Sequence, residues 1–309
     1  MIGYSRRFVI QTLAASVAAS AAPLPALAKG ETQETTPNLF IEANGTRYAY
    51  RRLGASRGVP LVFLIHFRGT MDSWDPAVVD PLAQHRPVIL FSNAGIGLSG
   101  GETPKSIEAM AGHVEAFLDA LKVRTVDLLG FSIGGFIAQQ VALDRPGLVR
   151  RLILAGTGPQ GGEDMTQLSP EARAVVLKAH SAAESLPILF FAPSANSQAA
   201  AQAFLSRLAE RRAEREVAVT PQASQAQIAA FVAWGTPPEG DRYGRLAEIK
   251  QPALVVNGNH DIMISTINSY ILAQHLPDAK LIIYPDAGHG ALFQYHEDFV
   301  AEVSRFLAS

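Results

Sequence analysis

The chain of 309 residues has a formal net charge of −2, from 26 Lys and Arg against 28 Asp and Glu. Its apolar fraction of 48% and charged fraction of 17% are typical of a folded globular protein, and no basic stripe indicates nucleic-acid binding. The sequence has no cysteine, which excludes a disulfide framework, a thiolate nucleophile and a cysteine-ligated metal site. A chain of this length can form one large α/β domain or such a domain with an inserted segment.

Residues 1–28 predict a removable export signal. Ser5-Arg6-Arg7 precedes a mildly apolar, Ala-rich stretch that ends in the small-residue site Ala26-Leu27-Ala28. The paired arginines favour a signal of the twin-arginine type, cleaved after Ala28, and therefore a periplasmic or secreted protein. An uncleaved N-terminal segment is the alternative. Residues 29–37 are expected to form a linker.

Buried strands alternate with helices along most of the remaining chain. Asn44-Gly45 predicts a tight hairpin between a strand over residues 38–43 and another over 46–53. Apolar runs predict further strands over residues 60–65, 88–91, 126–131, 152–154, 253–256 and 280–284, and helical spacing predicts helices over 106–121, 133–144, 267–275 and 296–308. This order predicts a doubly wound, mostly parallel α/β sheet.

Residues 158–245 interrupt that alternation. The stretch is rich in Ala, Gln and Arg and has no buried-strand run, so we expect a helical lid inserted between two strands of a core formed by 38–157 and 246–309. Apolar residues within 188–191, 204–208 and 228–234 should pack mostly on one another. Some should face the cleft, which favours a small, largely apolar substrate. The charge run from Arg207 to Glu216 is interpreted as a solvated helix face.

The motif Gly130-Phe131-Ser132-Ile133-Gly134 follows an apolar strand and opens a helix. This is the context of a nucleophile elbow, a strained turn that holds a serine hydroxyl above a sheet. A second match, Gly97-Leu98-Ser99-Gly100-Gly101, is followed by Glu102-Thr103-Pro104 instead of a helix, and we interpret Ser99 as part of a loop. Ser132 is the candidate nucleophile.

A serine nucleophile needs a base and a group that orients the base. His289, between two glycines just after a buried strand, is the candidate base, and Asp261, in the loop after the preceding strand, is the candidate orienting acid. Capping of the following helix is the structural alternative for Asp261. The alternative acids are Asp286, Glu163 and Asp164, and the less favoured histidines near the site are His260 and His296.

Backbone N–H groups should stabilise the oxyanion of an acyl-transfer intermediate. The N–H of Ile133 directly follows the nucleophile, and the N–H of Phe67 lies in the loop after the strand that ends near Ile65. In that loop His66 is expected to form a structural hydrogen bond. Arg68 could meet an anionic substrate, but a solvated surface position is favoured. Trp74 is expected to pack beneath the loop.

The chain resembles the α/β-hydrolases, specifically the lid-bearing serine hydrolases. The motifs that carry this resemblance, in order, are Ile65-His66 with Trp74, the loop Asn93 to Ser99, Gly130 to Gly134, Gly258 to Asp261, and Gly288-His289. The resemblance implies Ser132 as nucleophile, His289 as base and Asp261 as orienter. Two positions depart from the family pattern: Phe67 stands where many relatives have glycine, and Ser92 stands where relatives often have a structural aspartate.

The sequence therefore predicts a serine hydrolase of carboxylic esters or lactones that acts on a small-molecule substrate without cofactor or metal. The alternatives are a cofactor-free haloperoxidase or perhydrolase with the same triad, a carbon–carbon bond hydrolase, and a non-catalytic ligand-binding protein. We see no metal-ligand spacing, phosphate-binding loop or dinucleotide fingerprint.

Overall fold

The computed structural model describes residues 30–176 and 182–309. The predicted export signal over residues 1–28 lies outside the described residues and stays a prediction. Residues 30–37, expected to form a linker, lie against the rest of the protein, since Gln33 and Thr36 are 2% and 1% exposed. No helix in the described ranges is long and apolar enough to cross a membrane.

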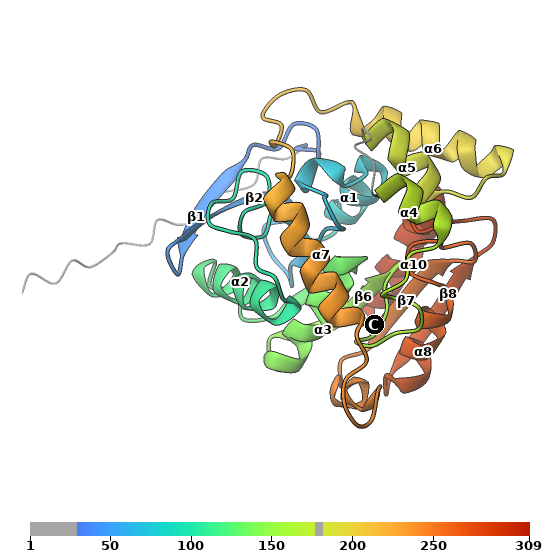
Figure 1. The fold of residues 1–309 in the computed structure, drawn as a ribbon. Helices are drawn as coiled ribbons and strands as arrows, with labels where there is room; N and C mark the ends of the chain where they lie inside the picture. Colours follow the sequence, from blue (N-terminus) through green and yellow to red (C-terminus); the bar gives the residue numbers. More distant parts are fainter. Residues whose placement is uncertain (1–29, 177–181) are drawn as a thin grey trace, which may run out of the picture.

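One eight-stranded sheet organises the molecule, in the order β1-β2-β4-β3-β5-β6-β7-β8 (Figure 1). The strands are β1 (Leu39–Ala43), β2 (Thr46–Gly54), β3 (Leu61–Leu64), β4 (Pro87–Phe91), β5 (Val126–Phe131), β6 (Val149–Ala155), β7 (Ala253–Gly258) and β8 (Ala279–Tyr284). Strand β2 runs antiparallel to both β1 and β4, and the other pairings are parallel. The predicted doubly wound, mostly parallel sheet is confirmed.

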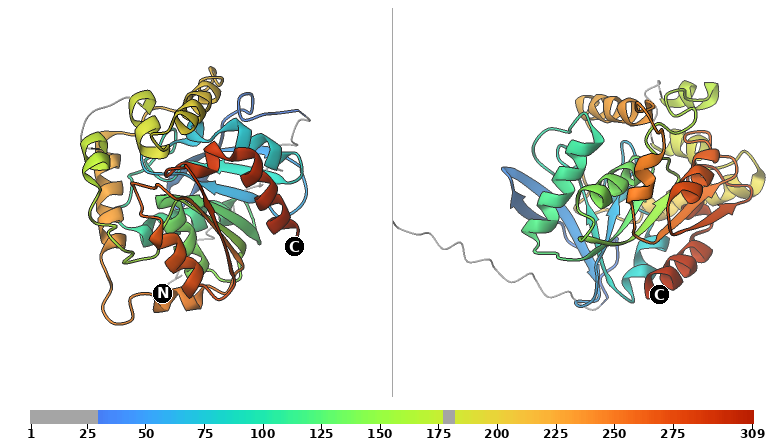
Figure 2. Two further views of the ribbon diagram at one scale, coloured as in Figure 1. Left: turned by 90° about the vertical axis from the view of Figure 1, so that its right-hand side faces the viewer. Right: turned by 90° about the horizontal axis from the view of Figure 1, so that it is seen from below.

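Helices cover both faces of the sheet (Figure 2). Those packed on the sheet or beside it are α1 (Pro76–Ala83), α2 (Ile107–Ala120), α3 (Ile133–Asp144), α8 (Ile267–His275), α9 (Ala291–Gln294) and α10 (His296–Ala308), with short 3-10 turns η1 (Met71–Ser73) and η2 (Gly244–Glu248). One face carries α2, α3 and α8, and the other carries α1, α9 and α10. Successive residues of β3 alternate between the two cores, as a strand buried on both faces requires.

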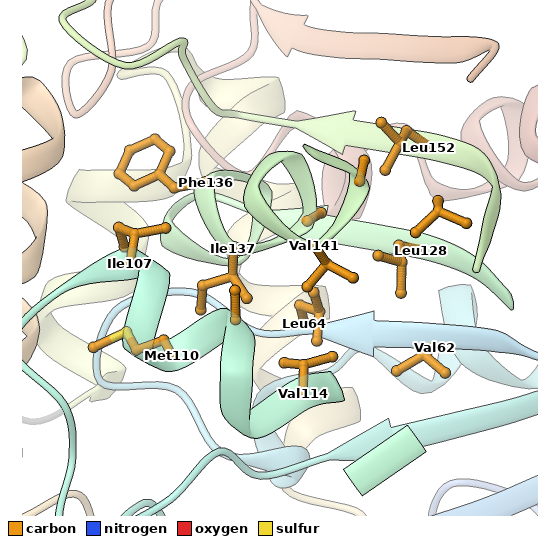
Figure 3. Close-up of a cluster of buried hydrophobic side chains, with 14 of the residues drawn as sticks. Val62, Leu64, Ile107, Met110, Val114, Leu128, Phe136, Ile137, Val141 and Leu152 are labelled. Carbon is orange, nitrogen blue, oxygen red and sulfur yellow. The ribbon is translucent and has the colours of Figure 1, made fainter. Parts of the chain in front are cut away.

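The core beneath α2 and α3 is apolar. Figure 3 shows Met110 and Val114 of α2 and Ile137 and Val141 of α3 facing Leu64 of β3. All five are buried, with at most 6% of their surface exposed. This packing fixes α3 against the sheet, and α3 begins directly after Ser132.

Four helices lie between β6 and β7 in the chain: α4 (Pro170–Val176), α5 (Ala182–Phe190), α6 (Ala195–Leu208) and α7 (Pro221–Gly235). Because β6 and β7 are hydrogen-bonded neighbours, this helical insertion leaves and re-enters the sheet at adjacent strands. Helix α5 contacts α4 and α6, and α6 packs on α1 and α9, whereas α7 lies apart from them against α2 (Figure 1). The expected role of the insertion as a lid, with bounds 158–245, stays a prediction.

The interpretation of Arg207 to Glu216 as a solvated helix face is wrong. Helix α6 ends at Leu208, and the rest of the run is irregular chain that lies on the core. Arg207 forms an ion pair of 2.6 Å with Asp75 at the start of α1. Arg211 is 4% exposed and donates to the carbonyls of Gln33, Glu34 and Thr36. Arg207 and Arg211 therefore attach the insertion to the core, whereas Glu210, Arg212, Glu214 and Arg215 are exposed.

Candidate active site

Ser132 lies on the turn between β5 and α3, with φ 59° and ψ −124°. A side-chain-bearing residue held at such angles stores about 1–3 kcal/mol of strain, so the surroundings must enforce it. A Cβ on Gly130 would collide with the backbone of Gly134, and a Cβ on Gly134 would collide with the carbonyl of Leu64. The hydroxyl of Thr157 donates to the Ser132 carbonyl at 2.8 Å. The turn thus has the geometry of a nucleophile elbow.

His289 and Asp261 form a buried pair, with 2.8 Å between Nδ1 of the histidine and Oδ2 of the carboxylate. Their side chains are 1% and 0% exposed. Because an ionised carboxylate can only accept, Nδ1 carries the proton in this pair and Nε2 is left with a free lone pair. The other carboxylate oxygen of Asp261 accepts from the N–H groups of Met263 and Ile264, at 2.8 and 3.0 Å. Asp261 therefore both caps a local turn and orients the imidazole.

The alternative residues lie in other interactions. Asp286 accepts a hydrogen bond of 2.6 Å from Ser194, and Glu163 forms an ion pair of 2.8 Å with Arg242. Asp164 follows Glu163 in a turn, His260 is exposed, and His296 begins α10. Within the described ranges, Asp261 is the carboxylate that contacts His289.

The loop that carries His289 packs closely on the end of α5. The N–H of Gly290 donates to the Phe190 carbonyl at 2.8 Å, and a Cβ on Gly288 would lie 2.8 Å from that same oxygen. The ring of Phe131, which precedes the nucleophile, lies 4.9 Å from the His289 ring between centroids. The flanking glycines therefore allow the insertion and the strand end to enclose the imidazole.

A cavity of about 520 Å³ has both Ser132 and His289 in its wall. Apolar side chains of the insertion and one core residue form much of the remaining wall: Val175, Val176, Leu186, Leu189, Phe190, Leu205, Leu208 and Met263. Among the described residues, no hydrogen bond joins the Ser132 hydroxyl to His289. Such catalytic hydrogen bonds often tighten only when substrate binds. The cavity brings two of the three predicted triad residues to one space, with Asp261 behind the histidine.

The loop after β3 borders the same cavity. Phe67 lies in the cavity wall, and Ile133 begins α3 directly after the cavity-lining Ser132. In the described structure, neither the Phe67 nor the Ile133 N–H donates to a protein acceptor, which leaves both available to a ligand. Nδ1 of His66 lies 2.8 Å from the Phe67 carbonyl, consistent with the expected structural role. Burial lowers the pKa of His66 to about 4, so its ring is neutral at neutral pH.

Arg68 is exposed at the surface, as expected, but it also contacts the insertion. Its side chain is exposed but anchored: Nε donates to Ser224 Oγ at 3.0 Å, and its backbone N–H donates to Gln227 Oε1 at the same distance. Ser224 and Gln227 lie one turn apart on α7 and are each 5% exposed. The loop after β3 is therefore attached to α7 of the insertion. Trp74, as expected, is buried nearby, with its ring 4.8 Å from that of Phe63.

Glu216 provides a carboxylate beside the position where relatives often have an aspartate. Ser92 Oγ donates to both of its carboxylate oxygens at 2.9 Å. The N–H groups of Met71 and Leu98 donate to it at 2.5 and 2.9 Å. The sequence analysis missed this residue because Glu216 lies more than 100 residues from all three donors, and no local pattern links them. A carboxylate from the insertion thus anchors the loops that follow β3 and β4.

Comparisons with known proteins agree with this architecture. The family model of the alpha/beta hydrolase fold matches residues 60–294. The chain is similar in structure to an alpha/beta hydrolase fold protein from Chitinophaga pinensis, with a TM-score of 0.85 and 41% identity, over 90% of this chain and 100% of that one. It is also similar to Est816, described as an N-acyl homoserine lactone degrading enzyme, with a TM-score of 0.68 and 29% identity, over 87% of this chain and 100% of that one.

A curated relative is BpoC of Mycobacterium tuberculosis, named as a non-heme bromoperoxidase. It is 26% identical over 286 residues, which cover 88% of this chain and 98% of the relative. The family model spans about three quarters of the chain and includes the Ser132 turn, the insertion and the His289 loop. The chain belongs to the alpha/beta hydrolase fold family and is an enzyme of the hydrolase type.

Proposed function

We propose that the protein is a serine hydrolase that cleaves a small, largely apolar carboxylic ester or lactone through an acyl-enzyme. Ser132 is the nucleophile, His289 the base and Asp261 the orienter. The observation that carries this proposal is the buried His289–Asp261 pair, whose histidine shares a cavity with a serine on a strained strand-to-helix turn. The description of Est816 as a lactone-degrading enzyme supports the substrate class.

In the proposed reaction, Nε2 of His289 removes the Ser132 hydroxyl proton as Oγ attacks the ester carbonyl. The charge on the tetrahedral intermediate is held by the N–H groups of Ile133 and Phe67, each worth about 3 kcal/mol in comparable sites. The Asp261 carboxylate stabilises the imidazolium. His289 then protonates the leaving alcohol, and a water activated by the same ring hydrolyses the acyl-enzyme. The helical insertion acts as the lid, since its apolar side chains form much of the cavity wall.

Pre-steady-state hydrolysis of p-nitrophenyl esters of increasing acyl length tests this mechanism. A burst of p-nitrophenol with an amplitude near the enzyme concentration is expected from the native protein, because acylation precedes slower hydrolysis. The Ser132→Ala variant should keep the native circular dichroism spectrum and lose the burst and the turnover. Turnover by that variant at the native rate would disprove the nucleophile assignment.

A second candidate activity is perhydrolysis, supported by the similarity to BpoC, which is named as a bromoperoxidase. In this case hydrogen peroxide attacks the acyl-enzyme in place of water, and the released peracid oxidises bromide. Bromination of phenol red in acetate buffer with peroxide would reveal it. Activity that requires both acetate and Ser132 favours perhydrolysis, and its absence leaves hydrolysis as the function.

We also propose that the protein is exported through a twin-arginine signal, on the evidence of Arg6-Arg7 ahead of the Ala-rich stretch. Replacement of both arginines by lysine should retain the full-length protein in the cytoplasm, measured by cell fractionation. Normal export of that variant would contradict the proposal.

A further inference from the structure

The wall of the cavity that contains Ser132 also contains Arg68, which forms no ion pair with a carboxylate of the described residues. We propose that Arg68 binds a carboxylate group of the substrate, so that the preferred ester or lactone combines an apolar body with one negative charge. This inference rests on the proposed function and names the substrate class for the same site. Neither the family model nor the names of the relatives assign a role to this residue.

The charge balance of the cavity wall is the first observation. Arg68 forms no ion pair with an acid in residues 30–176 or 182–309, and the sequence has no Asp or Glu in residues 1–29 or 177–181. The two carboxylates in the same wall are already engaged. Asp72 pairs with Arg51 at 2.6 Å, and Glu216 accepts from the three donors described above.

The other arginine of the wall is engaged as well. Nε of Arg215 lies 3.8 Å from Asp72, and its side chain is half exposed. Arg68 is therefore the arginine of the wall that has no protein carboxylate beside it. An arginine in a cleft wall with no carboxylate beside it has donors free to pair with a carboxylate of a ligand.

The second observation is that the Arg68 side chain is held in place. Nε donates to the buried Ser224, Nη1 reaches the Val176 carbonyl at 3.4 Å, and the guanidinium carbon lies 4.8 Å from the centre of the Phe67 ring. These contacts leave the Nη2 donors without a partner in the described structure. A guanidinium fixed on one edge can present its remaining N–H groups to a carboxylate with less loss of side-chain freedom than a solvated arginine.

The third observation is the backbone conformation. Arg68 has φ 60°, a left-handed conformation that glycine adopts at little cost and that other residues rarely adopt. A strained residue beside the proposed oxyanion donor Phe67 favours a functional role for its side chain. Arg68 lines the same cavity as the nucleophile. A substrate carboxylate bound there would fix the scissile carbonyl near Ser132.

Two pairs of esters that differ only in charge test the proposal. Monophenyl glutarate and phenyl pentanoate differ by a carboxylate in place of a methyl group on the acyl side. The pair 4-acetoxybenzoate and 4-methylphenyl acetate makes the same exchange on the alcohol side. In at least one pair, Arg68→Gln should lower the anionic-to-neutral ratio of kcat/KM about tenfold or more, mainly through KM of the anionic ester. Arg68→Lys should retain part of that preference, because it keeps the charge without the planar fork.

Arg212→Gln is the matched control, because Arg212 is an exposed arginine of the insertion that does not line the cavity. It removes the same charge and should change the ratio less than about threefold. An equal loss on both members of each pair in Arg68→Gln, or no change in either ratio, would overturn the proposal and leave Arg68 a structural residue of the loop.

A binding measurement separates this proposal from the proposed function. Calorimetry with the unreactive Ser132→Ala protein should show that monophenyl glutarate binds more weakly when Arg68→Gln is added. If the native enzyme hydrolyses none of the four esters, the hydrolase assignment for these substrates fails, and the calorimetric difference still decides whether Arg68 binds a carboxylate. Equal affinity in the two proteins counts against Arg68.

Discussion

Removal of the Glu216 carboxylate should destabilise the protein by an amount set by the donors that it leaves behind. In Glu216→Ala the N–H groups of Met71 and Leu98 lose their acceptor, while the Ser92 hydroxyl can rotate to another partner. Each orphaned buried donor costs about 1–3 kcal/mol. Two effects reduce this cost. Glu216 lines the cavity, so water can reach part of the space that the removed side chain leaves. Burial also raises the pKa of Glu216, so the native protein already holds this carboxylate charge at a cost in free energy.

Both corrections place the expected loss near the lower end, at about 2–3 kcal/mol of unfolding free energy, or roughly 3–5 °C in Tm for a chain of this length. Urea denaturation followed by circular dichroism measures it. Glu214→Ala is the control, because Glu214 is exposed and its side chain accepts one hydrogen bond, from the N–H of Asn38. It should change stability by less than about 0.5 kcal/mol.

A rescue variant makes this prediction specific. Ser92→Asp places a carboxylate on the core side of the same contact, since Ser92 Oγ lies 2.9 Å from both Glu216 oxygens. In the Glu216→Ala background it should restore about 1 kcal/mol or more, because the same two N–H groups regain an acceptor. The reasoning is refuted if Glu216→Ala is as stable as the native protein, or if Ser92→Asp destabilises that variant further.

Three further predictions concern the site. Asp261→Asn should reduce kcat for ester hydrolysis by roughly 10⁴ with the fold intact, since the amide no longer fixes the His289 tautomer; a loss under tenfold in steady-state kinetics would contradict the role of Asp261. His66, with its pKa lowered to about 4, stays neutral when folded but gains a proton when unfolded below its usual value of 6.5. The unfolding free energy should therefore fall by up to about 3 kcal/mol as the pH is lowered from 6.5 to 4. In urea titrations, His66→Gln should reduce this dependence of stability on pH. An unchanged dependence in the variant argues against the lowered pKa of His66. Gly134→Ala should lower the free energy of unfolding by more than about 3 kcal/mol or prevent folding, because the added Cβ meets the Leu64 carbonyl. Gly112→Ala is the control: it lies in open space within α2 and should be neutral or stabilising by up to about 1 kcal/mol. Equal melting temperatures of the two variants would contradict the steric argument.

Sequence signals that act over a few residues predicted the fold well. Asn44 and Gly45 both have the positive φ that the tight hairpin requires. Ser106 caps α2 at the expected boundary by accepting from the Ala109 N–H. The strand-to-helix context separated Ser132 from Ser99, which is a loop residue that donates to the Ser92 carbonyl. In each case the residues that determine the conformation are neighbours in the chain.

Two features were not predicted, one because of a local proline and one because its partners are distant in the chain. Helix α1 begins with the Asp75 cap followed by Pro76, which are local signals, but Pro81 within it weakens the helical pattern. The run from Arg207 to Glu216 has the spacing of a solvated helix, yet its partners Asp75 and Ser92 lie in the core. No periodicity indicates which carboxylate a folded chain will bring to a buried serine.

The attachment of the insertion has a consequence for engineering by exchange of segments between homologous enzymes. The ends of the insertion lie on adjacent strands, so the sheet alone would accept a foreign segment in its place. The acceptor for the N–H groups of Met71 and Leu98 would leave with it, because that acceptor is Glu216. If this protein receives a foreign segment that lacks the glutamate, it therefore needs aspartate at position 92. If a homologue receives the insertion of this protein, the homologue needs a small hydroxyl residue at the position that corresponds to 92. Substrate range and core sequence should accordingly change together in this protein.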